Sequence, residues 1–158
     1  MIRPEWWWSN RSDRSDPSKE LPLSSELTPH RQADTSDDIR LFAVAAARAA
    51  DDKKGNDILV LDVGDTIGIT DMFVIASASN TRLVAFLAED IERAVKEAGG
   101  SGPVASEGLD DANWVLLDFG GFIVHIFLEE TRRFYDLERL WSDAPKIDWK
   151  AAAPAESV

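Results

Sequence analysis

Residues 114–128, WVLLDFGGFIVHIFL, are apolar at almost every position and are interrupted in the middle by two glycines. Adjacent glycines between apolar runs predict a two-residue turn, because glycine readily adopts the positive φ angles of tight hairpins. The stretch is therefore predicted to form two antiparallel strands that turn at Gly120 and Gly121, with Phe119 opposite Phe122. A chain with this hairpin must build a sheet and must place apolar side chains on both of its faces.

Side chains alternate between the faces of a strand, so this register assigns every hairpin residue to one face. The first face is wholly apolar and is expected to pack under helices; it carries Val115, Leu117, Phe119, Phe122, Val124 and Ile126. The second face adds an acid, a histidine and a tryptophan to its apolar residues; it carries Trp114, Leu116, Asp118, Ile123, His125 and Phe127. A single core needs only the first face.

The rest of the chain shows helical and extended patterns in turn. The predicted order is a helix capped by Ser36 and ending near Lys53 to Gly55, strands over 57–63 and 71–79, a helix from Ser79 or Asn80 to Gly99, a short strand over 103–108, the hairpin, and a helical segment over 129–145. Two long helices and about five strands predict an α/β (α+β) fold. Its mixed five-stranded sheet is expected to be flanked by helices and covered mainly on one face.

The second face is expected to be partly exposed, because two long helices cover both faces of such a sheet with difficulty. An exposed apolar patch rimmed by polar groups is typical of a protein-binding surface, and tryptophan is a frequent interface anchor. We therefore predict that the second face binds a protein partner. The alternative is that the segment over 129–145 folds back and buries it with Phe134, Leu137, Leu140 and Trp141.

The net charge of −12 is concentrated in the second part of the chain. Residues 36–158 carry 23 acidic and 12 basic side chains, and residues 1–35 carry 6 and 5. An acidic surface repels phosphate backbones, so little direct binding to nucleic acid is expected. A basic protein partner is favoured because opposite fields speed encounter. Acidity that serves only solubility is an equally weighted alternative.

Composition and pattern exclude further classes and divide the chain. The absence of cysteine excludes disulfides and thiol nucleophiles, and no apolar run approaches the roughly 18 residues of a membrane span. Residues 1–35 are predicted to be a disordered extension without a targeting signal, 36–149 a single domain and 150–158 a disordered tail. A cytoplasmic protein is expected. The Trp6, Trp7, Trp8 cluster in the extension is either a short docking motif or an incidental apolar patch.

Residues with catalytic potential are sparse in the predicted domain. His125 is its only histidine, and a lone histidine on a strand is more often packed or at an interface than catalytic. Asp118 shares its face, but no nucleophile elbow, phosphate-binding loop or dinucleotide fingerprint accompanies them. Paired acids such as Asp110 and Asp111 are interpreted as solvated, although Mg²⁺ prefers such ligands. The sequence therefore predicts no catalytic residue, metal site or cofactor.

Four separated stretches carry a resemblance to a known family. They are DILVLDV at 57–63, ITDMFVIASASNTR at 69–82, EG at 107–108 with WVLLDFGGFIVHIF at 114–127, and EETRRFYDLERLWSDAP at 129–145. In order and spacing they resemble the ribosomal silencing factor family, also called the Iojap family. The match covers about residues 36–149 and leaves the N-terminal extension outside.

The resemblance implies a small cytoplasmic protein that is not an enzyme and that has a nucleotidyltransferase-like fold without catalytic motifs. It also implies docking on large-subunit ribosomal protein fourteen, at the face where the small subunit joins. Bound there, such a protein blocks subunit joining and represses translation when nutrients are scarce. In agreement, the chain lacks the Gly-Ser pair at a helix start and the correctly placed Asp-x-Asp motif of nucleotidyltransferases.

The resemblance marks Trp114 and Phe119 as partner-contacting positions, and Tyr135 and Leu137 as candidates for the same surface or for dimer contacts. The family usually has Gly-Asp at the hairpin turn, so Gly121 here removes a charge and puts any salt bridge at the tip in doubt. The predicted partner-binding set is Trp114, Leu116, Asp118, Phe119, Gly120, Gly121, Ile123, His125, Phe127 and Tyr135. A degenerate nucleotidyltransferase-fold enzyme and a self-associating scaffold protein stay open as alternatives, and so does a homodimer.

Overall fold

The computed structural model describes residues 35–151 of the 158-residue chain. The strands are β1 (Asn56–Asp62), β2 (Met72–Ala78), β3 (Ala105–Glu107), β4 (Trp114–Asp118) and β5 (Phe122–Leu128). The helices are α3 (Ser36–Asp52), α4 (Gly64–Ile67), α5 (Thr81–Glu97), α6 (Glu129–Tyr135) and α7 (Leu137–Leu140). The predicted extension with its tryptophan cluster, and most of the predicted C-terminal tail, lie outside the described residues, so those interpretations stay predictions.

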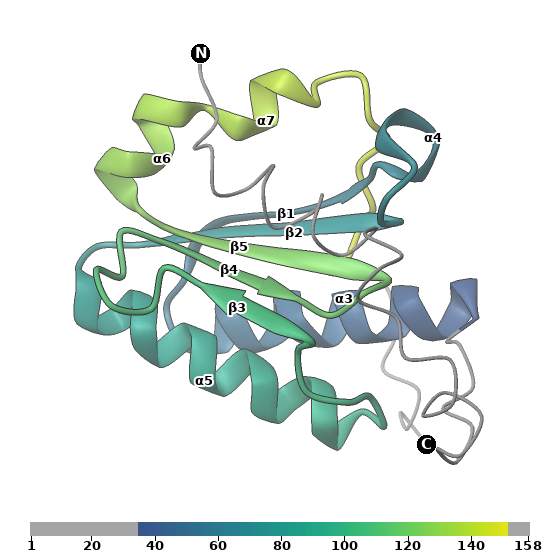
Figure 1. Ribbon diagram of the computed structural model, residues 1–158, viewed down its shortest axis with the longest axis horizontal. Helices are drawn as coiled ribbons and strands as arrows, with labels where there is room; N and C mark the ends of the chain where they lie inside the picture. Colours follow the sequence, from purple (N-terminus) through teal and green to yellow (C-terminus); the bar gives the residue numbers. More distant parts are fainter. Residues whose placement is uncertain (1–34, 152–158) are drawn as a thin grey trace, which may run out of the picture. The chain divides into compact units, whose positions relative to one another are not determined.

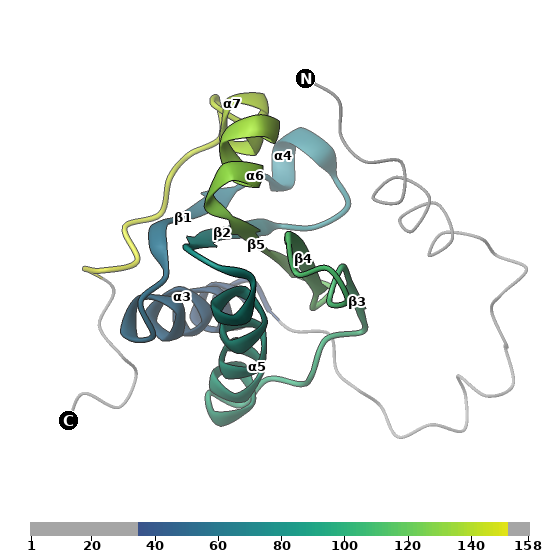
Figure 2. The same cartoon turned by 90° about the vertical axis from the view of Figure 1, so that its left-hand side faces the viewer.

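These strands form one mixed sheet in the order β1-β2-β5-β4-β3. β2 and β5 are parallel, and the other neighbouring strands are antiparallel. α3 and α5 lie against one face of the sheet, whereas α6 and α7 lie over the opposite face (Figures 1 and 2). The predicted mixed five-stranded α+β sheet is confirmed. The expectation that helices cover mainly one face is wrong.

Both long helices begin at side-chain caps. At α3 the Thr35 hydroxyl accepts a hydrogen bond from the Asp38 amide at 3.1 Å, and the Asp38 carboxylate accepts one from the Thr35 amide at 3.1 Å. This reciprocal capping box needs an acid three residues after the cap, which places the cap at Thr35 instead of the predicted Ser36. At α5 the expected cap is confirmed, since the Asn80 side chain accepts from the Leu83 amide at 2.8 Å.

The hairpin has the predicted register. The Phe119 amide donates to the Phe122 carbonyl at 2.9 Å, and Asp118 lies opposite Ile123. Its first face packs into one apolar cluster with α3 and α5, as predicted. Gly120 has a φ of 91°, which explains a glycine at that turn position.

The second turn glycine has a different physical reason. A Cβ atom at Gly121 would lie 2.6 Å from side-chain atoms of Ile39, which belongs to the first turns of α3. A larger residue at position 121 therefore requires the Ile39 side chain to shift from its packed position. Glycine at position 121, where the family usually has an acid, therefore fits the close packing of the turn against α3.

The second face of the hairpin is buried, which corrects the expectation of an exposed patch. Its neighbours on β2 are also apolar, and Phe73 and Ile75 are fully covered. Exposed fractions on the second face are 6% for Trp114, 2% for Leu116, and 0% for Asp118, Ile123, His125 and Phe127. The physical reason is that the chain after β5 folds back over this face, which was the alternative left open by the sequence.

The returning segment is two short helices instead of one. Asp136 has a φ of 49° and separates α6 from α7. Leu137 and Trp141 turn inward, and the Trp141 ring meets the Phe73 ring edge-on with centroids 5.7 Å apart. Phe134 and Leu140, which the alternative also placed inward, remain 70% and 42% exposed. The break at Asp136 changes which residues share a face, so the predicted apolar stripe is divided.

Replacement of Gly121 by alanine should lower the free energy of unfolding by about 1–3 kcal/mol, because the new methyl group overpacks the contact with Ile39. The double variant Gly121→Ala/Ile39→Ala should lose less than the sum of the two single changes. Urea unfolding of the four chains measures this coupling. Gly120→Ala is the control, since nothing lies within 4 Å of a Cβ there and its cost is backbone strain. Additive losses at Gly121 and Ile39 would contradict the contact.

Candidate functional site

Four of the predicted partner-binding residues come together at one end of the hairpin. The Trp114 ring lies 4.7 Å from the Phe127 ring and 4.8 Å from the Tyr135 ring, measured between centroids. Its indole N–H donates to Nδ1 of His125 at 3.1 Å. Trp114 is therefore the centre of an aromatic cluster that joins β4, β5 and α6. We call Trp114, His125, Phe127 and Tyr135 the aromatic cluster.

His125 has a packing role in this cluster. Its ring is fully buried and meets the Phe73 ring edge-on at 4.7 Å between centroids. Acceptance of the Trp114 N–H at Nδ1 fixes the orientation of the imidazole between strands β4 and β2. Of the two interpretations of a lone histidine, packed or at an interface, this geometry agrees with the packed one.

The predicted residues at the hairpin tip form a second, separate group. The Asp118 carboxylate accepts from the Gly120 amide at 2.8 Å, so this acid stabilises the turn. The Gly120 carbonyl accepts from the Thr70 hydroxyl at 3.1 Å, and the Gly121 carbonyl accepts from the Asp71 amide at 2.9 Å. The tip is thereby fixed to the loop before β2.

Phe119, Leu116 and Ile123 lie in the interior. The Phe119 ring stacks on Phe122 at 4.7 Å between centroids and belongs to the core under α3 and α5. Leu116 and Ile123 are buried between the aromatic cluster and the hairpin tip. The ten predicted residues therefore do not form one exposed surface in this chain. Tyr135, Gly120 and Gly121 keep partial exposure.

Exposed side chains of α6 and α7 lie on the outer side of these helices. The alternative left open by the sequence placed Phe134 and Leu140 in the interior, whereas Tyr135 was predicted to contact a partner. The Phe134 ring meets the Tyr135 ring edge-on at 5.0 Å, and Tyr135 in turn contacts Trp114. These ring contacts connect the buried sheet with the surface of α6. Leu140 of α7 is also exposed. We call Phe134, Tyr135 and Leu140 the α6–α7 ridge.

Arg132 fixes the position of this ridge and was also missed. It is 6% exposed, its Nε donates to Glu138 of α7 at 3.0 Å, and its Nη1 donates to the Ser77 hydroxyl at 3.1 Å. Nη1 also lies 3.3 Å from the Asn56 carbonyl, so one guanidinium joins α6, α7, β1 and β2. Burial of a charge is costly unless the charge is paired. The hydrogen bonds of Arg132 to Glu138, Ser77 and Asn56 provide this pairing and hold α6 and α7 against the sheet. The sequence signal for this role was the presence of arginines and acids close together at 132–138, RRFYDLE.

Charge and metal chemistry give no second candidate among residues 35–151. In that range no three His, Asp or Glu side chains are grouped closely enough to hold a metal ion. A hollow of about 460 Å³ beside Arg132 is lined by acids and arginines together, including Glu129 and Arg133. On α5, hydrogen bonds to Glu97 and Asp90 raise the pKa of Arg93, which stays charged. None of the helices described is long and apolar enough to cross a bilayer.

Replacement of Trp114 by alanine should lower the free energy of unfolding by about 3–5 kcal/mol, because it opens a cavity in the aromatic cluster. Trp114→Phe keeps the ring but removes the donor to buried His125, which should cost about 1–3 kcal/mol. Denaturant unfolding monitored by far-UV circular dichroism measures both. A fully stable Trp114→Ala chain would mean that this side chain is not part of the core.

Comparison with known proteins agrees with the architecture and the motifs. The family model described as "Ribosomal silencing factor during starvation" matches residues 35–157. The ribosomal silencing factor RsfS of Bacillus subtilis is 40% identical over 103 residues, which cover 65% of this chain and 86% of that protein. The mouse protein named "Mitochondrial assembly of ribosomal large subunit protein 1" is 34% identical over 108 residues, covering 67% of this chain and 47% of its own length.

A solved structure is also similar. A crystal structure of a Chromobacterium violaceum protein superimposes with a TM-score of 0.63 at 34% sequence identity, covering 75% of this chain and 96% of that chain. The family match includes every strand and helix of the structure described above. With its fold, its motifs and its relatives in agreement, this chain belongs to the ribosomal silencing factor family.

Proposed function

We propose that this protein binds the large ribosomal subunit and sterically blocks joining of the small subunit, repressing translation under nutrient limitation. The partner proposed is large-subunit ribosomal protein fourteen at the intersubunit face. The observation that carries the proposal is the family match over residues 35–157. The name of the mouse relative, which refers to the large ribosomal subunit, supports the choice of subunit. The proposed place of action is the cytoplasm.

The α6–α7 ridge is the proposed contact surface. Phe134 and Leu140 are exposed and Tyr135 is partly exposed, and large aromatic residues are enriched among those that dominate binding energy. The Phe134 ring packs edge-on against Tyr135, which contacts the buried Trp114, so one side of the Phe134 ring is supported before binding. A preorganised surface loses less conformational entropy on association. Trp114, His125 and Phe127 then act from beneath, by positioning the ridge, while Tyr135 is the predicted residue that reaches the partner.

Steric exclusion explains how such a small domain would act. A bound protein that occupies the intersubunit face prevents a second body from occupying the same volume, and this requires neither a catalytic step nor a cofactor. A specific interface of roughly 1,200–2,000 Å² is sufficient for stable occupancy. The 23 acidic and 12 basic side chains of residues 36–158 favour encounter with a basic ribosomal protein.

The variant Phe134→Ser/Leu140→Ser should bind purified large ribosomal subunits about tenfold more weakly than wild type, because two exposed anchors are lost. Both side chains are exposed, so the free energy of unfolding should change little. Co-sedimentation with large subunits measures binding, and light scattering on addition of small subunits measures joining.

Phe86→Ser is the matched control, since Phe86 is a 46% exposed aromatic residue on α5, on the other side of the sheet. It should bind and block as the wild type does. Equal binding by the ridge variant and the control would remove the ridge from the interface. No binding by the wild type would reject the proposed function itself.

A further inference from the structure

The segment after α7 runs along the outer edge of β1, on the side away from β2. We call residues 144–150 the strap. The Asp62 amide donates to the Pro145 carbonyl at 2.8 Å, and the Ile147 amide donates to the Val60 carbonyl at 2.8 Å. Lys146 forms an antiparallel bridge with Leu61. Figure 2 shows the strap passing beside β1 toward α3. It therefore occupies the edge where a further strand would pair.

A single aromatic residue anchors the far end of the strap. Trp149 is 8% exposed and packs into the core cluster with α3. Its indole N–H donates to the Ile58 carbonyl at 3.2 Å, so a side chain continues the row of bonds that main-chain amides begin. Arg48 of α3 donates to the Lys150 carbonyl at 3.4 Å. The strap is thus held by a few hydrogen bonds and by the packing of Ala144, Ile147 and Trp149.

The main chain of the strap adds only a short pairing to β1. Lys146 and Leu61 form an isolated antiparallel bridge, not a ladder of several pairs. An open hollow of about 620 Å³ lies beside it, lined by Ile58, Leu59, Lys146 and Trp149 and by charged side chains that include Asp57 and Glu138. A fully paired strand would form more main-chain hydrogen bonds with this edge than the strap does.

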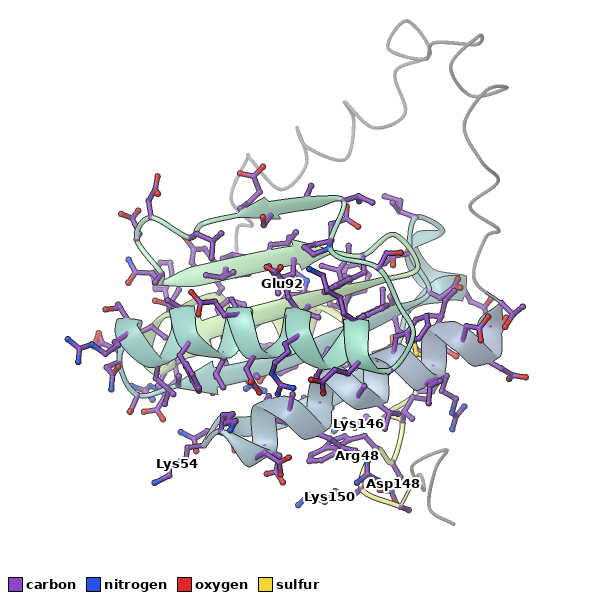
Figure 3. All side chains as sticks on the ribbon, turned by 90° about the horizontal axis from the view of Figure 1, so that it is seen from below. Arg48, Lys54, Glu92, Lys146, Asp148 and Lys150 are labelled. Atoms are coloured by element: carbon purple, nitrogen blue, oxygen red, sulfur yellow. The ribbon has the colours of Figure 1, made fainter. Side chains whose placement is uncertain are left out.

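The strap carries two lysines and the β1 edge that forms its seat carries acids. In the strap sequence, PKIDWK, the lysines flank an isoleucine, an aspartate and a tryptophan. The edge it covers carries Asp57 and Asp62 near its two ends, in a domain with a large excess of acids. Figure 3 labels Lys146, Asp148 and Lys150 on the strap, beside Arg48 of α3. The seat is thus acidic at both ends and apolar between them.

We propose that the outer edge of β1 is a docking groove for an extended peptide segment of a partner protein, and that the strap closes it in cis. The recognised pattern is the one the strap itself shows: basic, apolar, acidic, aromatic, basic. Strand addition would supply main-chain hydrogen bonds, and the Trp149 seat would supply side-chain specificity. A second copy of β1 fits less well, because antiparallel pairing would bring the acids of the two copies close together.

The test uses the full chain and a fluorescent peptide with the sequence of residues 143–151. Trp149→Ala removes the anchor, so the peptide should bind this variant about tenfold or more tightly than it binds the wild type, whose groove is occupied. Ile147→Pro is a second opening variant, which removes the donor to Val60 without touching β1 or the Trp149 seat. Fluorescence anisotropy measures affinity, and a peptide with both lysines replaced by glutamate should bind at least several-fold more weakly.

Amide exchange locates the binding. Exchange at the Asp62 amide, which the strap protects, should accelerate in Trp149→Ala and slow again when the peptide is added. A scrambled peptide of the same composition is the control. Equal binding to wild type and both variants, or equal binding of the scrambled peptide, would overturn the proposal. Self-association of the variants without peptide binding would identify a second copy as the occupant and overturn it as well. No ribosome is needed, so the outcome is independent of the proposed function.

Discussion

The central strands of this sheet are apolar on both faces, and the rest of the structure follows from the need to cover them twice. All seven residues of β2 are buried, and β5, its parallel neighbour, is buried over six of seven. Parallel strands are stable where both faces are shielded from water. α3 and α5 shield one face. The chain then turns directly from β5 into α6, and the buried Arg132 fixes that helix against β1 and β2.

Because both faces of the sheet are covered, the proposed contact surface lies on helices α6 and α7 and not on the strands. The aromatic residues of β4 and β5 are too deeply buried to meet a partner, but they support Tyr135 and, through it, Phe134. A strand face was the expected contact surface; the helical ridge built on it is the one now proposed. In this proposal the sheet supports the ridge, and the two short helices provide the side chains that contact the partner. The chain also covers an edge of the sheet, because the strap lies along the outer side of β1.

Much of the fold was accessible to sequence reasoning because local rules dominate it. The two glycines at 120 and 121 were enough to set the hairpin register, and the spacing of apolar residues located both long helices. The errors in assigning the helices were local competitions between similar signals. Thr35 displaced Ser36 as the cap because Asp38 completes a reciprocal pair only with Thr35. The left-handed Asp136 divided a pattern that a helical period reads as continuous.

The sequence by itself determined which residues alternate to which face, roughly where the two long helices lie and to which family the motifs are similar, since these depend on neighbours along the chain. It did not determine exposure. Whether Trp114 meets water depends on Tyr135 and the rest of α6, and whether Gly121 tolerates a side chain depends on Ile39, 82 residues earlier in the chain. Only the tertiary structure decides such questions, because burial is a property of everything that packs around a residue and of nothing in the residue alone.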